Sequence, residues 1–180
     1  MKHTYLDSTN KKAVRDFLIN QFTFNQVVGL PGPDVNEYIR YFESRGVKSF
    51  EMYENDRFTL INQIRRIRTS SLVSIKCDDI ITADASKEDT LYDLDFCKTA
   101  RHLKEHIAKF KSNFIMTFAR RIPDEETIKT FFDARKELIV SSIDKFNPFK
   151  HTVFTTESGS EYILVNYRDT SNMCCIAKIA

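Results

Sequence analysis

The 180-residue sequence lacks tryptophan altogether and has only four glycines, four prolines and four cysteines. So little glycine and proline excludes collagen-like and low-complexity chains, which are rich in both. The cysteines form no Cys-x-x-Cys pair, and their spacing fits neither a zinc site nor a secreted disulfide framework. We therefore expect free thiols, as in proteins of a reducing compartment, and no bound metal.

Long apolar runs and an excess of charge are also missing. The N-terminus indicates neither a signal peptide nor a membrane anchor, so we expect a cytoplasmic protein with no membrane partner. The 27 basic and 25 acidic residues give a net charge of +2, which offers no general argument for binding nucleic acid. The sequence is 42% hydrophobic, and its 15 phenylalanines are spread over several segments. This composition is typical of one globular domain, which we place at 1–180.

The order of the hydrophobic patterns predicts an α/β fold. A helix at 9–22 comes first, as part of an N-terminal extension (1–23) that could cover a site as a lid. Strands are then expected at 25–30, 48–53, 72–76, 90–96 and 113–118, and helices at 35–45, 56–68, 99–110 and 123–143. Three further strands, at 152–156, 161–167 and 173–179, have no helices between them. This order implies a Rossmann-like three-layer sandwich, with a mainly parallel sheet and antiparallel C-terminal hairpin strands at one edge.

Spacings of three and four residues assign the inner faces of two of these helices. In the helix at 35–45, the residues expected to face inward are Val35, Tyr38, Ile39 and Phe42. In the helix at 56–68, the residues expected on the buried side are Phe58, Ile61, Ile64 and Ile67.

Candidate site residues follow the predicted strands, because an open parallel sheet binds ligands at the carboxyl ends of its strands. The first strand runs into Gly29, Pro31 and Gly32, and a helix begins at once. The glycines would let a ligand approach the backbone, and the helix N-terminus offers free amide donors. Glu54 follows the second strand, 22 positions after Gly32, near the spacing expected for an acid that binds ribose hydroxyls. The alternatives are an ordinary strand-to-helix turn and a solvated loop acid, with Glu51 as a second candidate acid inside the strand.

Further acids follow the third and fourth strands. Asp78 or Asp79 could accept a hydrogen bond from an adenine amino group, although a polar capping turn explains them equally well. Period-two alternation puts Asp93 and Asp95 on one side of the fourth strand, toward the crevice. Phe96, directly after them, could cover a bound ligand.

Other reactive or charged residues give weaker signals. Cys97 has no matched histidine base, and His102 and His106 share a helix face but lack a third ligand, which favours a solvated face. Basic residues that could contact nucleic-acid phosphates are Arg65, Arg66, Arg68, Arg120 and Arg121. The near-neutral net charge favours solvated helix faces for these as well.

Between residues 24 and 179 the chain resembles the class I, Rossmann-like S-adenosylmethionine-dependent methyltransferases. The resemblance rests on Val-Val-Gly-Leu-Pro-Gly-Pro at 27–33, the acids Glu54 and Asp78-Asp79, the segment Asp-Leu-Asp-Phe-Cys at 93–97, and the closing hairpins. It implies that the first loop contacts the methionine moiety of S-adenosylmethionine or S-adenosylhomocysteine. It also implies that Glu54 holds the ribose and that an acid after the third strand binds adenine. The residues of the fourth strand would border the reaction centre, with Asp95 as the first candidate base and Asp93 as the second.

The sequence departs from the family at the first loop. Gly29 stands where the family has an acid, and Pro31 stands where it has a glycine. The resemblance implies a methyltransferase that acts on nucleic acid or protein. The missing acid and the compact length support a different hypothesis, a catalytically inactive module that binds nucleic acid or protein. A third hypothesis, binding of NAD or a nucleotide, lacks the full Gly-x-Gly-x-x-Gly motif.

Overall fold

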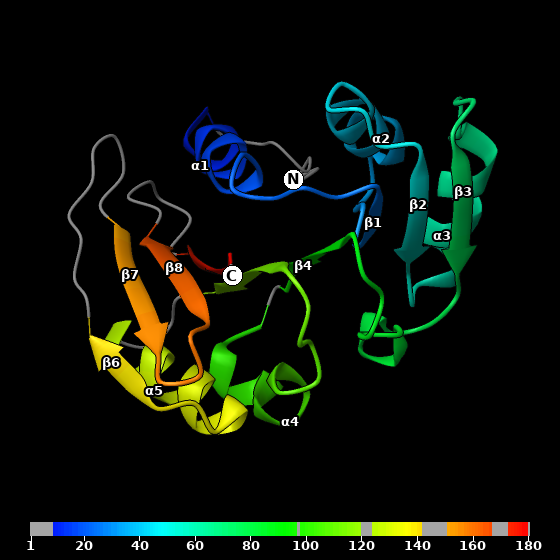
Figure 1. Cartoon of the computed structure of the whole chain (residues 1–180). Coiled ribbons are helices and arrows are strands. Elements are labelled where there is room, and N and C mark those ends of the chain that lie inside the picture. The colour runs from blue at the N-terminus through cyan, green and yellow to red at the C-terminus, as the bar shows by residue number, and fades with distance from the viewer. Residues whose placement is uncertain (1–8, 97, 120–123, 142–150, 167–172, 180) are drawn as a thin grey trace.

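A computed structural model describes residues 9–96, 98–119, 124–141, 151–166 and 173–179, which form one nine-stranded sheet with helices on both faces (Figure 1). The helices are α1 (Thr9–Ile19), α2 (Val35–Glu43), α3 (Arg57–Arg66), α4 (Lys104–Ile107) and α5 (Asp124–Arg135), with 3₁₀ turns η1 (Ile80–Thr82) and η2 (Ala100–Leu103). The strands are β1 (Gln26–Gly29), β2 (Ser49–Tyr53), β3 (Leu72–Lys76), β4 (Thr90–Asp95), β5 (Phe114–Ala119), β6 (Ile139–Ser141), β7 (His151–Thr156), β8 (Glu161–Asn166) and β9 (Met173–Lys178).

The strand order is β3-β2-β1-β4-β5-β9-β8-β7-β6. Strands β1 to β5 pair in parallel, and β1 lies between β2 and β4, so the order reverses there. From β5 onward every pair is antiparallel. The predicted Rossmann-like fold, with parallel strands and an antiparallel C-terminal edge, is confirmed. The reversal between β1 and β4 marks the place where a sheet of this kind binds ligands.

Helices α1 and α2 pack on one face of the sheet. The four predicted inner residues of α2 are all buried, namely Val35, Tyr38, Ile39 and Phe42. Asp34 caps this helix by accepting a hydrogen bond from the backbone N–H of Glu37 (3.1 Å). This face holds one of the two hydrophobic clusters.

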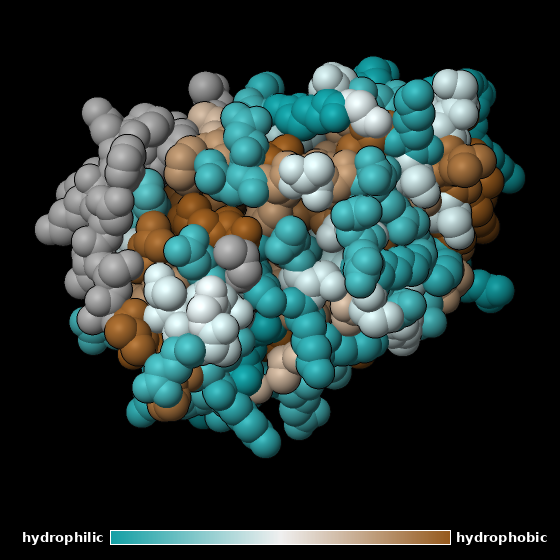
Figure 2. Space-filling view, viewed as in Figure 1, coloured by the Kyte–Doolittle hydropathy of each residue, from teal (hydrophilic) through white to brown (hydrophobic). Residues whose placement is uncertain are grey.

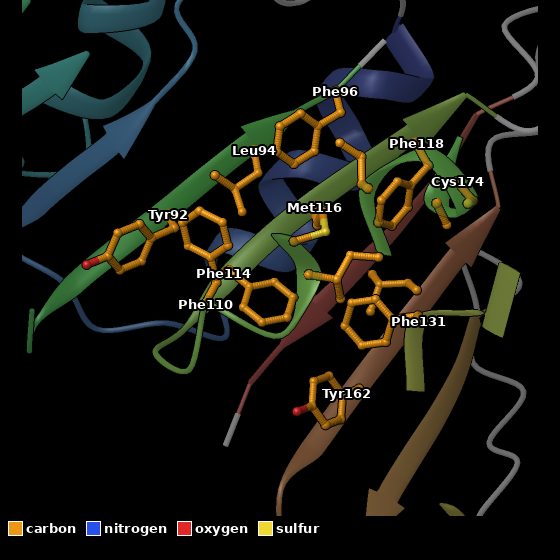
Figure 3. Packing of buried hydrophobic residues seen from close by; sticks show 14 of the residues in the cluster. Tyr92, Leu94, Phe96, Phe110, Phe114, Met116, Phe118, Phe131, Tyr162 and Cys174 are labelled. Atoms are coloured by element: carbon orange, nitrogen blue, oxygen red, sulfur yellow. The ribbon is translucent and has the colours of Figure 1, made fainter. Parts of the chain in front are cut away.

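Helices α4 and α5 cover the opposite face, over the second cluster. Figure 3 shows that its aromatic side chains come from several strands, with Tyr92 on β4, Phe114 on β5 and Tyr162 on β8, and from α5 with Phe131. Phe114 and Phe131 lie with ring centroids 6.0 Å apart. With helices on both faces, a ligand reaches this sheet at the ends of its strands, and in an open parallel sheet it binds at the carboxyl ends.

The predicted buried face of α3 is wrong. Phe58, Ile61 and Ile64 are 80%, 45% and 55% exposed, and Figure 2 shows hydrophobic surface at the edge of the molecule formed by α3 and β3. The buried residue of α3 is instead Gln63. The helix packs beside an edge strand, and hydrogen bonds of Gln63 turn the polar residue inward. Ile67, just past the helix, is partly buried, as expected.

Two other predicted helices are shorter than expected. The helix predicted at 123–143 ends at Arg135, because Lys136 adopts a left-handed φ of 55° that stops the α-helix. Residues Ile139–Ser141 then form β6, which pairs with β7. The helix predicted at 99–110 is reduced to η2 and α4. In the part of the chain that the structure describes, no helix has the length and apolar character needed to cross a membrane.

Candidate functional site

The candidate site lies at the carboxyl ends of β1, β2 and β4. Gly29 ends β1 and is paired with Met52 of β2 and Asp93 of β4. Pro31 is buried in the following loop. Gly32 has a φ of +66°, and nothing lies within 4 Å of where a Cβ would be. The loop therefore presents open backbone at a position that favours glycine.

Gln63 joins this loop to Glu54. Its amide nitrogen, Nε2, donates a hydrogen bond to the carbonyl oxygen of Gly32 (2.7 Å) and lies 3.5 Å from Oε2 of Glu54. The other carboxylate oxygen of Glu54 accepts a hydrogen bond from the backbone N–H of Asp56 (2.9 Å). The structure thus brings the predicted residues Gly32 and Glu54 together. The connecting residue, Gln63, was not predicted, although it shares a helix face with Leu60 and Ile67.

Glu51, the alternative acid, is committed to a different set of contacts. It accepts hydrogen bonds from Nζ of Lys76 (2.6 Å), from the Tyr53 hydroxyl (2.5 Å) and from Lys87. Burial raises the pKa of Glu51, but these three hydrogen bonds outweigh burial and lower the pKa to about 2. A buried charge paired in this way ties β2 to its neighbours, which leaves Glu54 as the candidate for binding a ligand.

The acids after β3 form local turns. The side chain of Asp79 accepts a hydrogen bond from the backbone N–H of Ile81 (3.2 Å) and so caps η1. The side chain of Asp78 accepts one from the backbone N–H of Asp79 (2.8 Å). Among the described residues, no hydrogen bond joins either carboxylate to Glu54. The polar capping turn that the sequence allowed is present, and a role in binding adenine stays a prediction.

Asp93 and Asp95 face α1, on the same side of β4, as the period-two pattern predicted. Arg15 of α1 donates a hydrogen bond to Asp93, and both side chains are completely buried. The second terminal nitrogen of Arg15, Nη2, lies 3.6 Å from Oδ2 of Asp95 and 3.4 Å from Oγ1 of Thr117. This arrangement places a guanidinium between the two candidate bases. An ion pair this deeply buried is costly to disrupt on one side only.

Tyr38 fills the space beside Gly29. A Cβ on Gly29 would overlap the Tyr38 hydroxyl and would lie 3.0 Å from the carbonyl oxygen of Asp93. Burial, the largest influence, raises the pKa of Tyr38 above its ordinary value, and the nearby Arg15 opposes this effect. The neutral phenol of Tyr38 therefore stands beside the strand end where the resemblance implies an acid.

Other residues predicted from the sequence lie apart from Arg15, Asp93 and Asp95. Phe96 packs into the cluster on the opposite face, near Leu94 and Phe118 (Figure 3), and is not brought to the two acids. At the end of α3, the exposed residues are Arg65, Arg66 and Arg68. The guanidinium of Arg68 donates to the carbonyl oxygen of Ile67 (2.7 Å). Three residues discussed from the sequence fall outside the described part of the chain, namely Cys97, Arg120 and Arg121.

Metal-binding and thiol chemistry find little support elsewhere in the molecule. Within the described ranges, no three His, Cys, Asp or Glu side chains gather in a way that could hold a metal ion. His102 is exposed, and its Nδ1 is hydrogen bonded with the Thr99 hydroxyl (2.9 Å). Cys77 is exposed, whereas Cys174 and Cys175 are buried, and the sulfur of Cys175 is hydrogen bonded with the Thr117 hydroxyl (2.9 Å).

A separate open groove of about 510 Å³ lies at the amino ends of β2 and β3. Its lining residues are Glu43, Gly46, Val47, Lys48, Ser70, Ser71 and Leu72. The Glu43 carboxylate there accepts hydrogen bonds from Ser71 (2.6 Å) and Thr69. Because the groove is at the edge away from Gly32 and Glu54, and its acid is already satisfied locally, the carboxyl edge remains the candidate site.

No family model matches the chain, and the search of curated proteins finds no relative. Solved structures are similar to it over nearly its whole length. The N-methyltransferase NodS from Bradyrhizobium japonicum WM9, in complex with S-adenosyl-L-homocysteine, is 9% identical with a TM-score of 0.55, covering 97% of this chain and 88% of that chain.

Two further solved structures are similar to this chain over most of its length. An S-adenosylmethionine-dependent methyltransferase from Mesorhizobium loti is 8% identical with a TM-score of 0.57, covering 96% of this chain and 99% of that one. A SAM-dependent methyltransferase from Leishmania major is 12% identical with a TM-score of 0.56, covering 96% and 74%. The chain therefore has the fold of the class I S-adenosylmethionine-dependent methyltransferases.

Proposed function

We propose that this chain is an S-adenosylmethionine-dependent methyltransferase that binds its cofactor at the carboxyl ends of β1, β2 and β4. The observation that carries the proposal is the hydrogen-bonded link from the Gly32 loop through Gln63 to Glu54. It lies beside β1, one of the two strands between which the order reverses, in a fold shared with structures such as NodS in complex with S-adenosyl-L-homocysteine.

The residues around Glu54 fit the adenosine part of this cofactor. The Glu54 carboxylate receives one backbone donor and one long contact from Gln63, which leaves lone pairs for ribose hydroxyls. The space around a Cβ built on Gly32 is open to 4 Å, which suits close approach of a ligand to the backbone. The predicted cofactor-binding residues are kept in the proposal as Gly29, Pro31, Gly32, Glu54, Asp78, Asp79 and Phe96.

The residues around Asp93 and Asp95 suit positioning better than proton transfer. When bound, the cofactor supplies a methyl group already activated on a sulfonium, so the protein has mainly to orient the acceptor and exclude water. Both acids face the Arg15 guanidinium, which pairs with the completely buried Asp93 and lies 3.6 Å from Oδ2 of Asp95, so both are committed to holding this cation. We therefore propose an acceptor whose attacking atom carries a lone pair without help from a base. Asp95 and Asp93 would act by orienting Arg15 and the strand end.

Nucleic acid and protein are the proposed classes of acceptor. The exposed arginines at the end of α3 favour a polyanion, and further basic residues follow β5 in the sequence. The residues assigned to this contact are Arg65, Arg66, Arg68, Arg120 and Arg121.

One observation favours a second candidate function, a catalytically inactive methyltransferase-like module that binds nucleic acid or protein. The Tyr38 hydroxyl fills the space at Gly29, and Arg15 neutralises the acids of β4. Both side chains take up room near the strand ends where the cofactor's amino-acid part would lie. In this candidate the fold serves as a binding surface and transfers no methyl group.

Calorimetric titration with S-adenosylmethionine, S-adenosylhomocysteine, NAD and ATP tests the proposal. We expect saturable binding of the first two only, weakened about tenfold or more by E54Q, because a hydrogen-bonded carboxylate contributes about 1.5–3 kcal/mol. The exposed acid Glu88 gives a matched control, since E88Q removes a charge from a loop far from the site. Labelled cofactor added to fractionated lysate then identifies the acceptor class. Binding without any transfer favours the inactive module, and the absence of binding rejects the cofactor site.

A further inference from the structure

We propose that Gln63 is a positioning residue of the cofactor site, which aligns the Glu54 carboxylate for the adenosine ribose and holds the Gly32 loop beside it. This inference rests on the proposed function. Gln63 touches neither the reacting atoms nor, in the proposal, the cofactor itself. It acts through the two groups that its amide nitrogen contacts.

The orientation of α3 is the first observation behind this inference. Helices at a sheet surface normally turn apolar residues inward and polar residues outward. In α3 the pattern is reversed, since Phe58 and Ile64 are exposed while Gln63 is 1% exposed. Burying a glutamine in place of these side chains costs free energy unless its polar atoms are paired. The contacts of Gln63 therefore contribute to the rotation of the helix, together with the partly buried Ile67 on the same side.

Both hydrogen-bond contacts of the Gln63 amide go to the candidate site. Nε2 carries two protons, of which one is directed to the Gly32 carbonyl at 2.7 Å and the other toward Oε2 of Glu54 at 3.5 Å. The two acceptors belong to loops that follow different strands, β1 and β2. A single rigid amide thus fixes the distance between them.

The other polar atom of this side chain, the amide oxygen, shows that stability alone does not account for the glutamine. Oε1 of Gln63 is buried, and no hydrogen-bond partner is found for it among the residues that the structure describes. An apolar side chain of the same length, such as methionine, would avoid this unsatisfied acceptor. What methionine could not do is hold the Gly32 carbonyl and the Glu54 carboxylate.

Loss of the amide would release the Glu54 carboxylate as well as the Gly32 carbonyl. Oε2 would lose its contact with Gln63, and the carboxylate would be held only by the backbone N–H of Asp56 at Oε1. The carboxylate could then rotate away from the ribose position. A carboxylate that is no longer preorganised binds the ribose hydroxyls more weakly. Contacts that a ligand makes with the adenine would be little affected, whereas the loop at Gly32 would lose its 2.7 Å hydrogen bond.

The test compares S-adenosylhomocysteine with its 2′-deoxyribose analogue on the wild type, on Q63M and on N62A. Asn62 is the matched control, because it is the adjacent residue of α3 and is exposed. In the wild type and in N62A, we expect the analogue to bind about tenfold more weakly than S-adenosylhomocysteine. In Q63M, we expect S-adenosylhomocysteine to lose about tenfold in affinity while the analogue changes much less, so that the ratio falls toward one.

The outcomes separate this inference from the proposed function. If the wild type does not bind S-adenosylhomocysteine, the proposed function and this inference fail together. If the wild type binds and Q63M leaves the affinity ratio of the two ligands unchanged, with both affinities equal to those of the wild type or equally reduced, Gln63 is merely structural and the inference alone fails.

Should Q63M not fold, the side-chain amide protons of Gln63 are followed by NMR in the wild type. S-adenosylhomocysteine should shift them and slow their exchange more than the analogue does, and equal responses would overturn the inference.

Discussion

Gly29 and Tyr38 together determine the shape of the β1 end. The tyrosine hydroxyl lies where any side chain at position 29 would have to be, and the Asp93 carbonyl oxygen closes the space from the neighbouring strand. The sequence showed only that Gly29 replaces an acid of the family. It could not show that a residue nine positions later fills the vacated space, because that contact depends on how α2 packs against the sheet.

We expect Gly29→Ala to lower the free energy of unfolding by about 1–3 kcal/mol, because the added methyl overpacks a buried site. Urea denaturation measures this change. In a Tyr38→Phe background the same substitution should cost clearly less, since the hydroxyl that the methyl overlaps is gone. Equal losses of unfolding free energy in the two backgrounds would show that the Tyr38 hydroxyl is not what excludes a side chain at position 29.

Among the elements, α1 is packed as part of the core. Val14, Leu18 and Ile19 are buried in the cluster shared with α2. Asp16 also accepts a hydrogen bond from the Tyr41 hydroxyl of α2 (2.9 Å). An N-terminal lid remains a proposal, and opening it at α1 would require exposing these residues together with the Arg15–Asp93 ion pair.

Replacing Arg15 with methionine should cost about 3–5 kcal/mol of unfolding free energy, because it leaves the buried Asp93 charge uncompensated. Lys12→Met is the matched control on the same helix, since Lys12 pairs with Asp16 at the surface (2.7 Å) and should cost about 0–1 kcal/mol. Adding Asp93→Asn to R15M should recover part of the loss. Thermal or urea unfolding of the variants decides the matter, and similar losses for R15M and K12M would contradict the buried pair.

The helices show how far sequence patterns predict packing. In α2 the apolar stripe is on one side only, and its predicted inner face is confirmed. In α3, Leu60 and Ile67 lie on one side and Phe58, Ile61 and Ile64 on another. The number of apolar residues favoured the second face, but the hydrogen bonds of Gln63 to groups 31 and 9 positions away selected the first. Local periodicity carries no information about such distant partners.

At the scale of the whole molecule, the topology was more predictable than the site. Alternation of strands and helices requires crossover connections, which give parallel strands, and hairpins give antiparallel ones. The sequence therefore predicts the mixed sheet and places Gly32, Glu54 and Asp95 at its carboxyl edge. The sequence does not predict that Arg15 pairs with the acids of β4, since the Arg15–Asp93 contact joins residues 78 positions apart in the chain.

Glu51 connects the local contacts of β2 to the acid stability of the whole fold. Its pKa in the folded protein is about 2, below the ordinary value of 4.5, because Lys76, Lys87 and Tyr53 stabilise the carboxylate against the effect of burial. The unfolded chain therefore takes up this proton at a higher pH than the folded chain does. Stability from Glu51 is fully present above about pH 5 and is lost progressively as the pH falls toward about 2.

We expect this single group to contribute about 1–3 kcal/mol at neutral pH, because solvent screens part of the attraction to the half-exposed Lys76, and a large part of this contribution disappears by about pH 3. Urea unfolding of the wild type and E51Q across this range tests it, because other carboxylates titrate alike in both proteins and cancel in the difference. The stability difference between the two should shrink steadily as the pH falls. E88Q, which removes an exposed loop acid, should follow the wild type throughout. A wild-type advantage over E51Q that stays constant from neutral to about pH 3 would mean that the lysines do not hold Glu51 ionised, and that the join between β2 and β3 depends on backbone pairing alone.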